Sequence, residues 1–143
     1  MALKIIDHGT KEYLQMVNLR NDILRKPLGL HFEEEELEEE KDDVLIGAFD
    51  DEKLIGCCLI TRMDSSTCRL RQMAVPSTLQ HKGIGASLVS FAENVARDIG
   101  YRMMMMHARK TAVGFYEKFG YNISGDEFME VTIPHFVMLK RLR

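Results

Sequence analysis

The stretch LQHKGIGASL, residues 79–88, joins a strand-like run to the most regular helical pattern in the chain. Between residues 84 and 99, apolar side chains recur at helical spacing, and Gly100 follows where a helix commonly ends. Gly83 and Gly85 therefore lie at a helix N-terminus, where no side chain keeps an anion from the backbone N–H groups. The stretch predicts a phosphate-binding turn, and the alternative is a tight turn that binds nothing.

Two common phosphate-binding motifs do not fit this stretch. The loop of nucleoside triphosphate hydrolases requires GxxxxGK[ST], whereas Lys82 precedes the glycines. The dinucleotide fingerprint GxGxxG requires a third glycine, and Leu88 occupies that position. We therefore expect neither activity.

Composition sets the class of protein. The 143 residues, with 45% hydrophobic and 29% charged side chains, predict one globular domain over residues 1–143. A formal net charge of -3 argues against nucleic acid as a partner. The three cysteines form no CxxC, and the five histidines form no cluster, so we expect no metal. No apolar run reaches the roughly 18 residues of a membrane span. A cytoplasmic protein with no membrane partner is expected.

The N-terminal half predicts strands around one helix. A short strand is expected at residues 3–7, and a helix at 10–25 would carry Leu14, Val17 and Leu24 on its apolar face. Three strands with short polar turns then predict an antiparallel meander. They span residues 44–49, 54–63 and 67–75.

The C-terminal half alternates helices and strands. After the helix at 84–99, residues 102–107 could form a helix, because methionine favours helices, but a short apolar run between two helices favours a buried parallel strand. Residues 111–119 predict a helix closed by Gly120. Two final strands are expected at 128–133 and 136–142, around Pro134. The order of elements predicts an α/β (α+β) fold with a mixed sheet.

Between the first helix and the meander lies an acidic run, Glu33 to Glu40, interrupted only by Leu37. Like charges at helical spacing repel one another, so a frayed helix with solvated side chains is expected. The alternative is an acidic rim that attracts a cationic amine.

Two motifs together resemble one family. QHKGIG, residues 80–85, matches the Q/R-x-x-G-x-G/A loop of the GNAT (Gcn5-related) N-acetyltransferases, and AVGFYEKFGY, residues 112–121, is similar to their A-x-x-F-Y-x-K-x-G-F/Y segment. The ending EFMEVTIPHFVMLKRL also resembles that of a small bacterial branch of the family. Arg109 is a departure, because family members often have Asn at that position.

The resemblance implies a mostly antiparallel sheet flanked by helices, with a splayed parallel strand pair at the cofactor site. The implied cosubstrate is acetyl-CoA, and a primary amine of a small molecule would attack its thioester directly. The implied cofactor-binding residues are Met73, Ala74, Val75, Gln80, His81, Lys82, Gly83, Ile84, Gly85, Ala86, Ser87, Arg109, Ala112, Phe115 and Tyr116. The Met73 N–H would stabilise the oxyanion, and Tyr116 would protonate the departing thiolate.

The base that deprotonates the amine is left open by the sequence. Glu127, Glu130 and His135 are candidates, and His107 is either catalytic or structural. Two other functions compete with the small-molecule enzyme: a noncatalytic acyl-CoA-binding sensor, and an acetyltransferase acting on protein lysines or N-termini. A homodimer is expected because dimers are common in the family.

Overall fold

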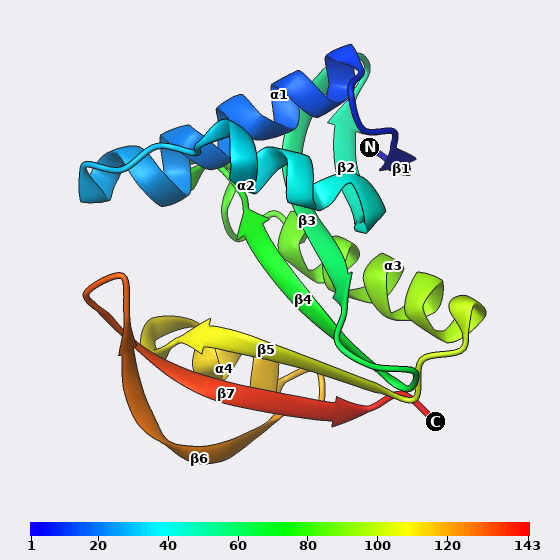
Figure 1. Cartoon of the computed structure of the whole chain (residues 1–143), viewed down its shortest axis with the longest axis vertical. Coiled ribbons are helices and arrows are strands. Elements are labelled where there is room, and N and C mark those ends of the chain that lie inside the picture. Colours follow the sequence, from blue (N-terminus) through cyan, green and yellow to red (C-terminus); the bar gives the residue numbers. More distant parts are fainter.

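The predicted meander forms the centre of a seven-stranded sheet in the computed structural model, which describes all residues from 1 to 143 (Figure 1). The strand order is β1-β2-β3-β4-β5-β7-β6, and every neighbouring pair is antiparallel except β4 and β5. The strands are β1 Ala2–Ile6, β2 Val44–Asp50, β3 Lys53–Arg62, β4 Thr67–Ala74, β5 Met103–Arg109, β6 Asn122–Glu130 and β7 Ile133–Arg141. This confirms the mixed fold and the parallel pair.

Helices cover the sheet on both faces, and each face has its own apolar core. Helix α1 (Lys11–Arg20) and the short α2 (Glu34–Glu38) lie over one face, as Figure 1 shows. Helix α3 (Ile84–Ile99) packs on the other face, together with the side chain of Tyr116 from α4 (Val113–Glu117). No helix is both long and apolar enough to cross a membrane.

Helix α1 begins as predicted but is rotated relative to the expected apolar face. The Thr10 side chain accepts a hydrogen bond from the Tyr13 N–H at 3.3 Å, which caps the helix. The buried positions are Tyr13, Met16, Val17 and Arg20, whereas Leu14 is 60% exposed. The assignment of Leu14 to the buried face was wrong, because a tyrosine and an arginine take core positions that the sequence pattern assigned to leucine.

Strands β4 and β5 separate partway along their length. Their register runs only from Thr67 opposite Met103 to Arg69 opposite Met105, although both strands continue. On the other side of β4 the pairing with β3 is irregular, because the register passes from Leu59 opposite Arg71 to Cys57 opposite Ala74. The two residues between, Gln72 and Met73, have no register partner on either neighbouring strand.

Gln72 has a φ of +57°, in the left-handed region that few side chains favour. The bulge therefore leaves Gln72 and Met73 outside the β3–β4 register, next to the point where β4 and β5 separate.

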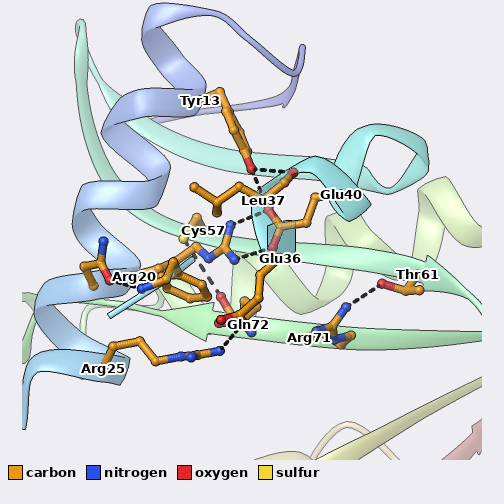
Figure 2. Close-up of polar contacts among 12 residues, drawn as sticks. Tyr13, Arg20, Arg25, Glu36, Leu37, Glu40, Cys57, Thr61, Arg71 and Gln72 are labelled. Carbon is orange, nitrogen blue, oxygen red and sulfur yellow. Dashed lines mark hydrogen bonds and ion pairs between the residues drawn. The ribbon is translucent and has the colours of Figure 1, made fainter. Parts of the chain in front are cut away.

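The acidic run is not wholly solvated. Its last residue, Glu40, is buried and accepts hydrogen bonds from the Tyr13 hydroxyl at 2.7 Å and from both terminal nitrogens of Arg20, at 2.9 and 2.5 Å (Figure 2). The Arg20 side chain is fully buried and lies over the Phe32 ring, 4.4 Å from its centroid. The expectation of a fully solvated run was wrong, because one carboxylate finds a buried cation from α1.

The closing hairpin differs from its predicted boundaries. Strand β6 begins at Asn122, and the turn lies at Val131 and Thr132, with φ values of +44° and +65°. Pro134 is part of β7, opposite Met129, so it does not separate the strands as predicted. The predicted helix at 111–119 is confirmed in shortened form, as a 3-10 turn at Lys110–Ala112 followed by α4.

Removing the buried carboxylate should destabilise the protein. Glu40→Ala leaves the Arg20 charge buried without its partner, so we expect the free energy of unfolding to fall by about 3–5 kcal/mol in urea titrations. Glu35→Ala is the control, because this exposed side chain of the same run forms no ion pair. Equal stability of Glu40→Ala and the wild type would show that the pair does not hold the acidic segment.

Candidate functional site

The two loop glycines have different structural roles. Gly83 is the N-cap residue of α3 with a φ of +79°, so glycine is favoured there by backbone conformation. Gly85 allows close packing, because a Cβ on it would lie 3.2 Å from Cζ of Phe115. The Ser87 N–H donates to the Gly83 carbonyl at 3.0 Å and is the first amide of the helix with such a partner. The three preceding N–H groups, at Ile84, Gly85 and Ala86, have no acceptor within the helix.

The loop that leads to α3 is tied to the end of β4. Gln80 donates from its side-chain amide to the Val75 carbonyl at 3.3 Å. His81 has a φ of +69°, and its side chain and that of Lys82 are exposed. Lys82 forms no ion pair, so its charge is available to an anion at the helix N-terminus.

Helix α4 brings two aromatic side chains to this loop. Phe115 lies against Gly85, and Tyr116 packs edge-on to Phe115 with 5.0 Å between ring centroids. Tyr116 is 7% exposed, and burial, with a smaller contribution from Cys58, raises its pKa well above the usual value. The phenol is therefore protonated at neutral pH and well above it.

The other predicted cofactor residues lie near the same strand ends. Met73 and Val75 are half-buried and pack against the core beneath α3, whereas Ala74 is buried in the core beneath α1. Arg109 ends β5 opposite His135, and the half-buried Ala112 immediately precedes α4. Contacts thus join the loop to Phe115 and Tyr116, while Arg109 stands at the far end of β5.

Two of the candidates for the base have different surroundings. Glu127 is exposed on β6 and forms an ion pair with Lys110 at 2.9 Å. His135 is 4% exposed on β7, with Nδ1 2.7 Å from the Ile133 carbonyl oxygen. They do not contact one another.

Four polar side chains from four strands meet on the face of the sheet that α3 does not cover. His107 Nδ1 lies 2.9 Å from Glu130 Oε1 and 3.1 Å from Arg69 Nη2, and His135 Nε2 lies 3.6 Å from Glu130 Oε2. Burial opposes the ionisation of Glu130, but the His107 hydrogen bond and the charges of His107, His135 and Arg69 hold its pKa below the usual value. The sequence analysis identified His107, Glu130 and His135 as separate candidates and gave Arg69 no role. Only the strand register brings the four residues together.

A small polar pocket lies between the acidic segment and β4. Its volume is about 160 Å³, and Figure 2 shows several of its residues. The lining contains no apolar residue and consists of Glu36, Glu39, Glu40, Asp43, Thr61, Arg71 and Gln72. Burial raises the pKa of Asp43, although a hydrogen bond from Thr61 and the positive charge of Arg71 act to lower it. Because Gln72 directly precedes Met73, the pocket lies beside the bulge of β4. A larger hollow of about 440 Å³, between β1, β2 and α3, contains none of the predicted cofactor residues.

Comparisons with known proteins agree with this arrangement. The family model described as "Acetyltransferase (GNAT) domain" matches residues 26–142. The uncharacterised N-acetyltransferase YjcF of Bacillus subtilis is 31% identical over 125 residues, which are 85% of this chain and 87% of YjcF. The uncharacterised protein YyaT of the same organism is 35% identical over 81 residues, which cover 57% of this chain but only 55% of YyaT.

A solved aminoglycoside 6'-N-acetyltransferase, complexed with coenzyme A, has the same fold. Its TM-score is 0.85 with 18% sequence identity, over 100% of this chain and 98% of that one. The sheet with its splayed parallel pair and the glycine loop at a helix N-terminus define an acyltransferase fold. The chain belongs to the GNAT family of acetyltransferases and is an N-acetyltransferase.

Proposed function

We propose that the protein transfers an acetyl group from acetyl-CoA to a primary amine of a small molecule, by direct attack of the amine on the thioester. The observation that carries this proposal is the break in strand pairing of β4 at Gln72 and Met73, just before the chain enters the glycine loop. Backbone polar groups in a half-buried position need partners, and the amide-rich pantetheine arm of coenzyme A supplies them.

The pyrophosphate would bind at the start of α3. The N–H groups of Ile84, Gly85 and Ala86 have no acceptor in the helix, and Lys82 supplies a positive charge. The remaining contacts of the cofactor would come from Gln80, His81, Gly83, Ser87, Arg109, Ala112 and Phe115. The coenzyme A complex of the aminoglycoside 6'-N-acetyltransferase, whose fold this chain shares, supports the choice of cofactor.

The chemical step needs an oxyanion donor and a proton for the thiolate. The N–H of Met73, which has no register partner, would stabilise the oxyanion as the amine attacks. Tyr116, which is protonated at neutral pH, would give its proton to the departing sulfur as negative charge develops on the thiolate. Bond formation between nitrogen and carbon and cleavage of the carbon–sulfur bond then leave an amide and free coenzyme A.

The acceptor would be a small cationic amine. Four carboxylates and one arginine line the pocket beside Gln72, and two of the carboxylates, Glu36 and Glu40, are already paired with arginines outside it. The remaining acidic side chains, Glu39 and Asp43, favour a second ammonium group on the substrate. The small volume favours a free diamine over a protein lysine.

We also propose a cytoplasmic location, which three buried and unpaired cysteines support. The single domain over residues 1–143 and the homodimer stay predictions.

The cofactor site is tested by calorimetric titration with acetyl-CoA, free coenzyme A, ATP and NAD. We expect binding of the coenzyme A species alone, and its loss in Gly83→Asp, which puts a negative charge into the proposed pyrophosphate site. Gly100→Asp is a matched control at the other end of α3, because both glycines have positive φ and open space where a Cβ would lie. Retention of binding in Gly83→Asp, or its loss in Gly100→Asp, contradicts the assignment.

The role of Tyr116 is tested by Tyr116→Phe. We expect kcat to fall by about 100-fold with an unchanged Kd for acetyl-CoA, because the phenol acts only when the thiolate leaves. Because burial raises the pKa of Tyr116, deprotonation of the phenol should not limit the wild-type rate between pH 6 and about 9. An unchanged kcat would assign Tyr116 to packing.

The acidic pocket is tested by Glu39→Gln with 1,4-diaminobutane and butylamine as acceptors. We expect KM for the diamine to rise about two- to fivefold at low salt, with little change for the monoamine, because only the diamine carries a second charge. Glu38→Gln is the control, since Glu38 pairs with Lys41 and does not line the pocket. Equal effects of the two variants would remove the pocket from the acceptor site.

A further inference from the structure

His107 occupies a particular place on β5. Pairing between β4 and β5 ends at Met105, and His107 is the next residue on the same face of the strand. Its neighbours Met106 and Ala108 are buried in the core beneath α3, so the imidazole lies on the opposite face, with 24% of its side chain exposed. His107 thus stands where the two strands separate and where an acyl group would lie under the proposed function.

The imidazole has two polar neighbours at one nitrogen. Nδ1 lies 2.9 Å from Glu130 Oε1 and 3.1 Å from Arg69 Nη2. A guanidinium only donates hydrogen bonds and a carboxylate only accepts them, so Nδ1 can satisfy one neighbour and not both. The position of the proton on His107 therefore decides what the other ring nitrogen can do.

The carboxylate is the better partner. Its oxygen is closer to Nδ1, at 2.9 Å against 3.1 Å for the guanidinium nitrogen, and without a proton on Nδ1 the ring lone pair would face the negative oxygen at that short distance. Arg69 still interacts with the same carboxylate oxygen, at 3.9 Å. The proton of neutral His107 accordingly lies on Nδ1, and Nε2, which forms no hydrogen bond within the chain, keeps its lone pair.

The other candidates are less able to act. His135 has a 6% exposed side chain, and its Nδ1 is held by the Ile133 carbonyl. Glu127 is engaged with Lys110 on the outside of β6. Glu130 is held by His107. His107 is the one of these groups that presents a free lone pair on the open face of the sheet.

We propose that His107 is the general base of the reaction and that Glu130 is its positioning residue. This inference rests on the proposed function. The ammonium of the acceptor gives a proton to Nε2, and the neutral amine attacks the thioester carbonyl. Glu130 stabilises the imidazolium that forms. After the carbon–sulfur bond breaks, the thiolate takes the proton of Tyr116, and the second proton of the attacking nitrogen restores the phenol. The imidazolium releases its proton to solvent.

The charged and titratable groups around His107 come from three other strands. Arg69 of β4 and Glu130 of β6 contact it directly, and His135 of β7 lies on the far side of the Glu130 carboxylate. Phe128 packs edge-on to the ring at 5.1 Å and fixes its plane. A base held in this way keeps its orientation while the acceptor enters.

The first test needs no acceptor. In long-range nitrogen–proton NMR spectra of the full chain, we expect neutral His107 to carry its proton on Nδ1. Glu130→Ala should switch the proton to Nε2, because Arg69 then becomes the only partner of Nδ1. A proton on Nε2 in the wild type overturns the proposal, whatever amines the enzyme accepts.

The second test separates catalysis from structure. For His107→Gln, we expect kcat/KM with 1,4-diaminobutane to fall by about 100-fold at pH 7 and to recover as the pH approaches the pKa of the amine. Aniline, which is already neutral at pH 7, should be affected far less. His31→Gln is the control, because His31 is exposed and contacts only Glu33.

Equal losses with both amines would indicate a structural defect and overturn the assignment of the base. Binding of acetyl-CoA without acetylation of either amine by the wild type would instead contradict the proposed acceptor class. In that case the NMR test still applies: a proton on Nδ1 of His107 supports the assignment of the base, and a proton on Nε2 overturns it.

Discussion

The separation of β4 from β5 governs the arrangement of the whole proposed site. A parallel pair inside a sheet normally hydrogen-bonds along its whole length, but here the register ends after Arg69 opposite Met105. The bulge at Gln72 and Met73 removes the pairing with β3 at the same level. Gln72 and Met73 of β4 thus lie outside the strand register on both sides of an otherwise regular sheet. A ligand with amide groups, such as acetyl-CoA, can hydrogen-bond to the backbone of a strand where its pairing is interrupted.

The two faces of the opening have different charges, which divides the proposed reaction between them. On the α3 side, the helix N-terminus presents the N–H groups of Ile84, Gly85 and Ala86, and Lys82 adds a positive charge, which suit a pyrophosphate. On the α2 side, the acidic segment borders β4, and the buried pair of Glu40 with Arg20 attaches the segment to α1. The cofactor and the amine would therefore approach the bulge from opposite faces of the sheet.

Local signals in the sequence predicted the elements that depend on near neighbours. Helix α3, its glycine loop and the meander follow from periodicity and turn residues, and the structure confirms them. The burial of Glu40 could not be predicted, because it depends on an arginine 20 residues earlier. The meeting of Arg69, His107, Glu130 and His135 depends on the register of four strands, which no local pattern specifies. Leu14 was misplaced because Tyr13 and Arg20, which the apolar pattern does not count, take the core positions of α1.

The proposed function requires that the Met73 N–H is free in the unliganded protein and is occupied when acetyl-CoA binds. Amide hydrogen exchange at Met73, followed by NMR with and without saturating acetyl-CoA, measures this directly. We predict faster exchange at Met73 than at Leu70 in the free protein, and strong protection of Met73 in the complex. Protection of Met73 in the free protein, or no change on saturation, would show that the N–H is already paired and would contradict the account.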